Sequence, residues 1–323
     1  MQGTTCLVNF YGANGNRVLY ITIKGEMKMK KIFRLGLLAI LSVGVLSACS
    51  ANGSGSNANE KVHVKIGVSG SEDTYWDVLK KKAEAKNIEI ELISFSDYTL
   101  PNKALANKEV DLNSFQHLAF LSQFNVENDV NIVPIGATII APMALYSEKF
   151  KNVSDIPDGS KIAIPDDPSN QGRALKLLQS AGLIKLKQDA GLYPTTDEIE
   201  GNPKKLEIVP VVAQQTPRVL SDVAASAVNS GVATDAGLKL DGAIYKDDAS
   251  SEEAKPYVNV FAARAEDKDN ATYKTIVDLY HDADVAEAVK QDSKGANVVV
   301  DQSAEELQAT LDKLVADVKA QKK

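Results

Sequence analysis

The stretch Ile162–Leu178 reads I-A-I-P-D-D-P-S-N-Q-G-R-A-L-K-L-L, and the interpretation of the whole chain starts from it. It opens as a short apolar strand over Ile162–Ile164 and closes as a helix that runs to about Ala181. Pro165 and Pro168 oppose further strand pairing and an early start of the helix. The stretch therefore predicts a strand, a polar loop and a helix in that order.

The polar loop offers groups that suit a small anion. Ser169 or Asn170 is in position to cap the helix, which places Arg173 in its first turn. A helix start has free N–H groups and a partial positive charge, and an Arg side chain adds a planar fork that matches a carboxylate. Two interpretations stay open. The loop binds the carboxylate of a ligand such as an amino acid, or Arg173 pairs with Asp166 or Asp167 in a purely structural role.

The first 48 residues look like an export signal and not like part of a folded body. Met27–Arg34 is basic, and Leu35–Leu46 is an apolar run of 12 residues, too short to span a bilayer as a stable helix. The following Leu46-Ser47-Ala48-Cys49 resembles the lipobox of bacterial lipoproteins, in which the cysteine is lipidated and the chain is cleaved just before it. We predict a lipoprotein signal peptide over 27–48 and lipidation at Cys49; a chance cysteine in an uncleaved anchor is the alternative.

The segments on either side of this signal carry no expected fold. A basic n-region normally begins a protein, so we interpret residues 1–26 as an upstream extension, with Met27 or Met29 as the start. Residues 49–61 form a lipidated tether rich in Gly, Ser and Asn, which cannot bury apolar surface. These features predict a body held at the cell membrane, on its extracytoplasmic face, by two acyl chains.

Charge and motif content exclude several classes of function. Residues 1–48 carry six of the 36 Lys and Arg residues and one of the 43 acidic residues, so the rest has a net charge of about −12 and no predicted nucleic-acid partner. Residues 49–323 contain three histidines, His63, His117 and His281, which are not spaced as metal ligands, and one cysteine, Cys49. We therefore predict no metal site and no disulfide. No nucleophile elbow, phosphate-binding loop or dinucleotide fingerprint occurs, and we predict neither an enzyme nor a cofactor.

Strand and helix patterns alternate twice along the body. Val62–Val68 and Ile88–Phe95 flank a helix over about Glu72–Lys86, a βαβ unit that predicts a parallel sheet. Ser303 and Glu306 form a capping box for the last helix. Further patterns predict strands over 110–115, 132–147 (broken at Gly136 and Pro142), 206–212, 225–229 and 257–264, and helices over 116–127, 216–224, 270–292 and 305–319, the last with a core stripe of Leu307, Leu311, Leu314 and Val318.

A long extended run separates the two alternating regions, and this predicts two α/β lobes joined by extended crossings. We assign 62–141 and 255–323 to lobe 1 and 142–254 to lobe 2, with the final helices packed on lobe 1. A ligand would then bind between the lobes, at the carboxyl ends of the strands.

Aromatic and polar side chains follow these strand ends and are our candidates for the cleft. An aromatic side would face a polar side with Arg173 for a carboxylate and Asn229 to accept from an ammonium group. Such a pair suits a zwitterionic ligand with an apolar tail, and a thioether packs well on aromatic rings. Core packing for the two Phe residues and a structural role for the histidine stay open as alternatives. The aromatic side consists of Tyr98, Phe115, His117 and Phe120.

Several separated blocks make the chain similar to the MetQ/NlpA-type family of methionine-binding lipoproteins of ABC importers. The similarity runs from about Val62 to about Lys290. The blocks are F-S-D-Y-T-L-P-N-K-A-L at 95–105, D-L-N-S-F-Q-H at 111–117, P-D-D-P-S-N-Q-G-R-A-L at 165–175, L-I-K-L-K at 183–187, Q-T-P-R at 215–218, A-V-N-S at 227–230 and P-Y-V-N at 256–259.

The resemblance implies an α/β, two-lobed, periplasmic-binding-protein-like (type II) fold that closes on a ligand between its lobes. It implies a subunit that hands methionine, foremost L-methionine, to an ABC permease and its ATPase. Matching blocks assign Arg173 to the carboxylate, Asn229 to the amine, Asn170 to the loop, and Tyr98, His117 and Phe120 to the side-chain pocket. Another small amino acid or a methionine dipeptide as ligand stays open, as does a surface adhesin or interaction lipoprotein.

Overall fold

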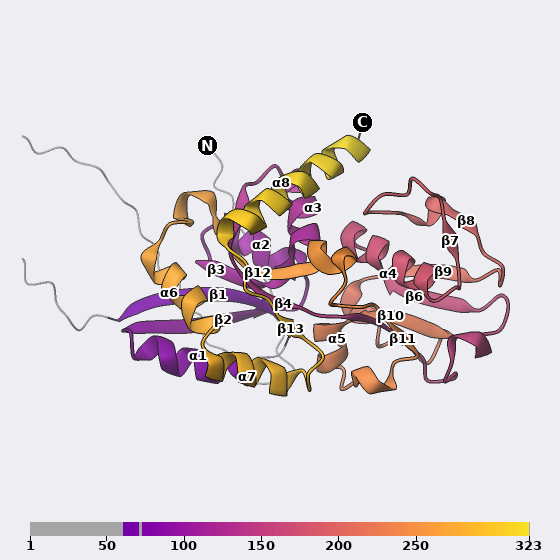
Figure 1. The fold of residues 1–323 in the computed structure, drawn as a ribbon, viewed down its shortest axis with the longest axis horizontal. Helices are drawn as coiled ribbons and strands as arrows, with labels where there is room; N and C mark the ends of the chain where they lie inside the picture. The colour runs from indigo at the N-terminus through magenta and orange to yellow at the C-terminus, as the bar shows by residue number, and fades with distance from the viewer. Residues whose placement is uncertain (1–60, 71–72, 323) are drawn as a thin grey trace, which may run out of the picture. The chain divides into compact units, whose positions relative to one another are not determined.

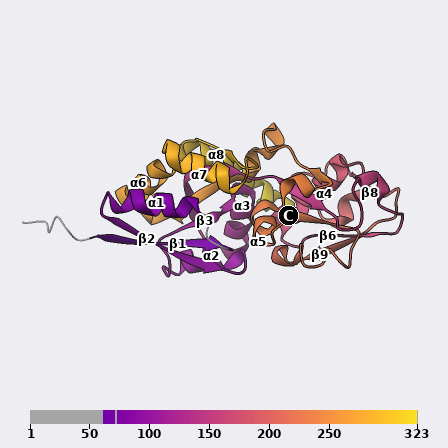
Figure 2. The same ribbon diagram turned by 90° about the horizontal axis from the view of Figure 1, so that it is seen from below.

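Two large β-sheets with helices packed on them, and a small two-stranded hairpin, make up the part of the chain that the computed structural model describes, residues 61–70 and 73–322 (Figure 1, and turned by 90° in Figure 2). The predicted signal peptide, Cys49 and nearly all of the tether lie outside these residues. Within them no helix is long and apolar enough to cross a membrane. Each sheet forms the centre of one lobe, so the structure confirms the predicted two-lobed α/β fold.

The first sheet has six strands in the order β13-β4-β12-β3-β1-β2. Strand β1 pairs in parallel with both β2 and β3, which confirms the parallel arrangement predicted from the βαβ unit. Strand β12 pairs antiparallel with β3 and β4, and β13 with β4. The strands are β1 (Val62–Ser69), β2 (Ile88–Phe95), β3 (Leu112–His117), β4 (Ile132–Ile140), β12 (Val258–Arg264) and β13 (Val298–Val299).

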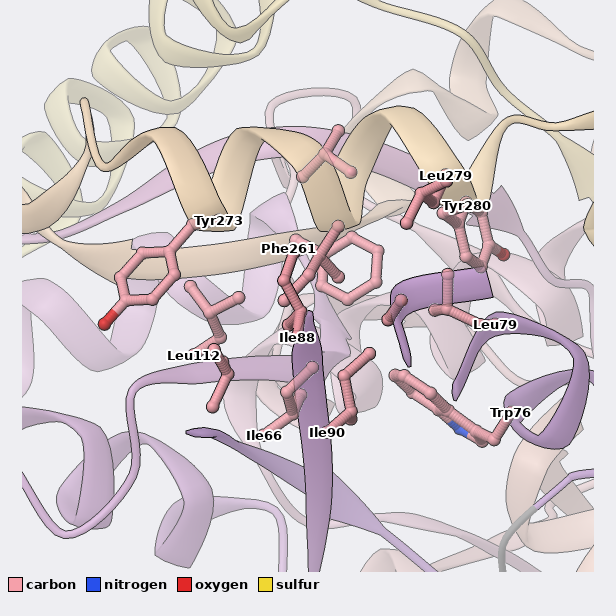
Figure 3. Packing of buried hydrophobic residues seen from close by; sticks show 14 of the residues in the cluster. Ile66, Trp76, Leu79, Ile88, Ile90, Leu112, Phe261, Tyr273, Leu279 and Tyr280 are labelled. Atoms are coloured by element: carbon pink, nitrogen blue, oxygen red, sulfur yellow. The ribbon is translucent and has the colours of Figure 1, made fainter. Parts of the chain in front are cut away.

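Helices cover both faces of this sheet because its central strands are apolar on both sides. Along β12, Phe261 points into one core while Val260 points into the other, as the two-residue period of a strand requires. Figure 3 shows Tyr280 and Trp76 packed near Phe261 in the first of these cores. The first core is closed by α1 (Tyr75–Glu84), α6 (Ala271–Tyr280) and α7 (Ala283–Asp292), and the second by α2 (Thr99–Ala106), α3 (Leu118–Asn128) and α8 (Ala304–Gln321).

The second sheet has five strands in the order β11-β5-β10-β6-β9. Strand β6 pairs in parallel with β9 and β10, and β5 runs antiparallel to β10. Helix α4 packs on one face and the short α5 on the other. The elements are β5 (Met143–Tyr146), β6 (Lys161–Pro165), α4 (Pro168–Ser180), β9 (Glu207–Val211), β10 (Ala225–Asn229), α5 (Ser230–Asp235) and β11 (Tyr245–Lys246), with a separate hairpin of β7 (Lys185–Leu186) and β8 (Ile199–Gly201).

Two crossings join the sheets. The first is very short: β4 ends in the first sheet at Ile140 and β5 begins in the second at Met143, so Ala141 and Pro142 make the passage. The chain returns through 247–257, between β11 and β12. The predicted break at Pro142 is confirmed, because proline removes a ladder donor there.

The predicted break at Gly136 is wrong, since β4 continues through it and Gly136 pairs with Phe261. The reason for a glycine at this position is the close approach of α6. A Cβ atom on Gly136 would lie 2.2 Å from Cγ1 of Val277, which is a core residue of that helix.

We expect Gly136→Ala to lower the free energy of unfolding by about 1–3 kcal/mol, because the added methyl overpacks the contact between α6 and β4. Urea unfolding of the two proteins measures the difference. Gly231→Ala is the matched control, since a Cβ at Gly231 meets no atom within 4 Å. Equal stability of Gly136→Ala and the wild type would show that α6 shifts without penalty.

Two predicted helical segments differ from the structure, and the last helix agrees with its prediction. Residues 216–222 form turns and no helix, because the backbone N–H groups of Arg218, Leu220 and Asp222 bond the carbonyl three residues back instead of four. The helix predicted over 270–292 is divided into α6 and α7, since Asp282 adopts an extended conformation and starts α7. The last helix starts at Ala304 with the predicted Ser303–Glu306 capping box, and its leucine stripe is buried against α3 and β4.

Candidate ligand-binding site

A cavity of ≈ 540 Å³ lies where the two lobes meet, lined by residues of both. It opens at the carboxyl ends of β2, β3 and β10, as parallel-sheet geometry predicts. The structure brings all seven sequence-predicted residues to this cavity: Tyr98, Phe115, His117, Phe120, Asn170, Arg173 and Asn229.

The start of α4 differs in detail from the prediction. Asp167 is the N-cap, with its carboxylate accepting from the backbone N–H of Asn170 at 3.0 Å, and Pro168 takes the first helical position. Proline is favoured there because that N–H has no helical partner. The predicted caps Ser169 and Asn170 are therefore wrong, and Arg173 lies in the second turn of the helix instead of the first.

Arg173 is buried and held by both interlobe crossings. Its Nε donates to Oδ2 of Asp247 at 2.7 Å, and Nη2 donates to the carbonyl oxygen of Ala141 at 2.8 Å. The guanidinium carbon lies 4.3 Å from the ring centroid of Tyr257, a cation–π contact. The structural alternative of pairing with Asp166 or Asp167 is thus wrong, because Asp247 takes that place.

The guanidinium still has donors for a ligand. Within residues 61–70 and 73–322, Nη1 of Arg173 makes no hydrogen bond. Since Nε and Nη2 hold the group in place, Nη1 can donate to a carboxylate in the cavity without reorganisation of the side chain.

A chain of amide and imidazole hydrogen bonds crosses the cleft beside Arg173. Nε2 of His117, from the first lobe, lies 3.1 Å from Oδ1 of Asn170, on α4 of the second. The same Oδ1 accepts from Nδ2 of Asn229 at 2.7 Å. Nδ1 of His117 accepts from the backbone N–H of Phe120 at 3.0 Å and caps α3.

These partners fix the protonation of His117. Burial and then the positive charge of Arg173 lower the pKa of His117 to about 3, so the ring is neutral at physiological pH. Because Nδ1 accepts from Phe120, the single proton is on Nε2 and is donated to Asn170. The structural alternative for the histidine, a satisfied buried ring, therefore agrees with its hydrogen bonds.

A pH effect on stability follows from that pKa. The usual pKa of His is 6.5, so below pH 6.5 His117 is protonated in the unfolded chain but stays neutral in the folded chain. The free energy of unfolding therefore falls as pH falls. From pH 7.5 to 5.5 the loss due to His117 is about 1.4 kcal/mol. Urea unfolding at both pH values, compared with His117→Asn, measures it; Asn keeps a helix cap.

The comparison with His117→Asn also removes an opposite contribution. Burial, Asp292 and Asp235 raise the pKa of Asp73 to about 6, so the folded state binds its proton first and gains stability as pH falls through that value. An equal change in both proteins between the two pH values would contradict the assignment to His117.

The oxygen of Asn229 is the acceptor that a ligand amine needs. Because Nδ2 of Asn229 donates to Asn170, Oδ1 is turned the other way. Among the described residues this buried Oδ1 has no hydrogen-bond partner, and Asn229 lines the cavity. Buried polar atoms are nearly always paired, so an unpaired acceptor in a cleft indicates a missing donor.

Three aromatic rings form the opposite wall. The centroids of Tyr98, Phe115 and Phe120 lie 5.9–6.1 Å from one another, in tilted or edge-on pairs. Tyr98 is partly exposed in the cleft, and Phe120 is buried among residues of α3 and α8. The core alternative thus holds in part for Phe120, which contributes to the cavity wall and to the second core.

Three residues that bear on the site were not among the sequence predictions, and of these Gln214 lines the cavity. Asp247 and Tyr257 hold Arg173, and Gln214 has a buried amide nitrogen with no partner in the described chain. Tyr257 belongs to the quoted block P-Y-V-N, which was the available signal for it. Asp247 stands in an ordinary polar run and had none. In the described part of the chain no His, Cys, Asp and Glu cluster could hold a metal ion.

The fold and the cleft define the class of protein: a two-lobed, periplasmic-binding-protein-like structure with its candidate site between the lobes. The model of the family described as NlpA lipoprotein matches residues 64–300, which is most of the chain. The chain belongs to the NlpA lipoprotein family, which confirms the resemblance carried by its sequence blocks.

The alignments with known relatives extend over nearly the whole length of each relative. It is 39% identical over 264 residues to the D-methionine-binding lipoprotein MetQ of Salmonella typhimurium, covering 80% of this chain and 96% of the relative. Protein PG110 from Staphylococcus aureus has a TM-score of 0.76 and 44% identity, covering 78% of this chain and 99% of that one. A nutrient binding protein from Burkholderia cenocepacia bound to methionine has a TM-score of 0.70 and 41% identity, covering 73% and 99%.

Proposed function

We propose that this protein is the methionine-binding subunit of an ABC importer, with L-methionine as its first ligand. It captures the amino acid between its lobes and delivers it to a membrane permease that a cytoplasmic ATPase drives. Cys49 carries the lipid that holds it at the extracytoplasmic face of the cell membrane. The protein binds and releases its ligand without chemical conversion.

The single observation that carries the proposal is the pair of unused polar groups in the cleft. Among residues 61–70 and 73–322, Nη1 of Arg173 has no hydrogen-bond acceptor and the buried Oδ1 of Asn229 has no donor. An α-amino acid supplies the complementary pair, a carboxylate and an ammonium group on one carbon. The methionine-related names and titles of relatives support the same ligand.

The tail of the ligand would lie against the aromatic wall. Tyr98, Phe115 and Phe120 offer ring edges and faces, and a thioether sulfur gains about 0.3–1.5 kcal/mol from such contacts. Phe120 has no hydroxyl, so the wall would select a ligand tail by its shape and polarizability more than by hydrogen bonds.

We further propose that the lobes comprise 62–141 with 255–323, and 142–254, and move about the two crossings. Arg173 contacts Ala141 in one crossing and Asp247 and Tyr257 in the other. A carboxylate bound to Arg173 would therefore act, through these contacts, on both crossings between the lobes.

Isothermal titration of the protein, unfolded and refolded to remove bound ligand, tests the proposal. We expect L-methionine to bind with submicromolar to micromolar affinity. D-methionine, a Gly-Met dipeptide and other amino acids are titrated next. Tighter binding of one of these keeps the importer class and changes the ligand. No binding of any of them by a folded protein would overturn the proposal in favour of an interaction lipoprotein.

A further inference from the structure

The side-chain hydrogen bonds of Asn170 all donate in one direction, toward Asp167, whose carboxylate is the final acceptor. Oδ1 of Asp167 accepts from the backbone N–H of Asn170 at 3.0 Å and from the Ser169 hydroxyl at 2.8 Å. Nδ2 of Asn170 donates to both carboxylate oxygens, at 3.1 Å each. A carboxylate only accepts, so it obliges Asn170 to present its NH₂ group on this side.

The other end of the Asn170 amide then faces the cleft as an acceptor. Its Oδ1 receives the Nε2 proton of His117 and an Nδ2 proton of Asn229. Turning the Asn170 amide over would set NH₂ groups against those two donors and its oxygen against the Asp167 carboxylate. The orientation of Asn170 is therefore determined from both sides.

The orientation of Asn229 depends on the same chain. It must give its NH₂ group to Asn170, so its buried oxygen has no partner in the part of the chain that the structure describes. An Asn side chain alone has no preference for which end faces a ligand, because its two ends differ little in shape.

We propose that Asp167 is a positioning residue for amine recognition: acting through Asn170, it sets the Asn229 amide with its oxygen toward the ligand. The cleft is thereby made selective for a ligand that bears an ammonium donor. Asp167 touches no ligand in this scheme. The inference rests on the proposed function, because L-methionine is the probe that supplies the ammonium group.

The test compares two ligands that differ only in the amine. L-methionine and 4-(methylthio)butanoate share the carboxylate and the thioether, and only the first has an ammonium group. Their dissociation constants are measured for the wild type and for Asp167→Ser. Serine is a good N-cap and keeps an acceptor for the Asn170 backbone N–H, but its short side chain does not hold the Asn170 amide. Asp166→Ser is the matched control, because the neighbouring carboxylate is exposed.

We expect Asp167→Ser to weaken L-methionine about tenfold while the dissociation constant of the amine-free analogue stays within about twofold. Asp166→Ser leaves both values unchanged. Equal weakening of both ligands in Asp167→Ser would assign Asp167 a structural role only and overturn the inference. Unchanged dissociation constants for both ligands would overturn it as well. A wild type that binds both ligands equally overturns it too but leaves the importer proposal intact.

Two further results keep the inference separate from folding and from the proposed function. Asp167→Asn keeps the Oδ1 acceptor and the shape but replaces Oδ2 by an NH₂ group next to Nδ2 of Asn170, so one of the two bonds to that amide is lost. We expect a smaller loss that is still selective for L-methionine, in a protein that melts close to the wild type. If Asp167→Ser does not fold, this variant decides. If the folded wild type binds neither L-methionine nor any of the other ligands titrated above, the proposed function is overturned and the inference with it.

Discussion

Arg173→Ala is expected to reduce the affinity for L-methionine by about 30- to 150-fold or more. The substitution removes the proposed donor for the ligand carboxylate, and a charge-assisted hydrogen bond in a closed cleft is worth about 2–3 kcal/mol. It also leaves Asp247 without its cation, next to the backbone N–H of Met143 that it accepts from. Isothermal titration gives the affinity, and urea unfolding gives the stability change separately.

Arg264 provides the control for loss of a buried arginine. It makes a similar set of bonds, from Nε to Asp267 at 2.6 Å and from Nη1 to the carbonyl oxygens of Leu105 and Val110. Arg264 does not line the cavity, so Arg264→Ala should lower stability and leave the affinity of the folded protein unchanged. Wild-type affinity in Arg173→Ala would reject the assigned carboxylate site.

Arg173→Lys separates charge from geometry. Lysine keeps the positive charge, but a single ammonium group cannot hold Asp247 and the Ala141 carbonyl while it also meets a ligand. We therefore expect an affinity between those of the wild type and Arg173→Ala.

The residues that could be predicted from the sequence are those whose local pattern places them at a strand end. Asn229 ends a strand of small apolar residues, and Arg173 follows a strand and a loop. Parallel-sheet geometry alone therefore places both residues at the edge of the sheet where the strands have their carboxyl ends. The partner of Arg173 could not be predicted in this way. Asp247 lies 74 residues further along the chain and arrives through the return crossing, whose path depends on how the lobes pack.

Helix boundaries show the same division between local and distant causes. The capping box at Ser303 depends only on residues close together in the sequence, and the structure confirms it. The interruption at Asp282 involves a distant contact, since His281 Nε2 lies 3.0 Å from the carbonyl oxygen of Ala137 on β4 and Lys82 of α1 pairs with Asp282. Residues 270–292 alone carry a continuous helical pattern, so that contact was invisible in the sequence.

The direction of the Asn229 amide is a further property that no sequence pattern contains. It follows from a sequence of partners, Asp167 to Asn170 to Asn229, in which each donor must meet an acceptor. The residue types predicted an amide near the ligand amine. The structure adds which end of that amide is bonded to Asn170 and which has no partner among the described residues.

Leu311→Ala is expected to lower the free energy of unfolding by about 2–5 kcal/mol, the largest effect on stability that we predict. Leu311 is 2% exposed and packs in the core that α8 shares with α3 and β4. Truncation leaves a cavity there, because the close-packed α3 and β4 cannot move in to fill the volume of one missing side chain. Urea unfolding measures the loss, and Lys313→Ala, at an exposed position of α8, should change stability by less than about 0.5 kcal/mol.

The same variant tests how α8 supports the site. Helix α3 carries Phe120 and is capped by His117, and its other face packs on α8. If α8 acts only by stabilising the fold, ligand at 100 times its dissociation constant adds back about 2.7 kcal/mol, and the affinity of folded Leu311→Ala equals that of the wild type. A weaker affinity in the folded variant would instead mean that the α8 contact sets the position of α3, and with it the hydrogen bond from His117 that orients Asn170.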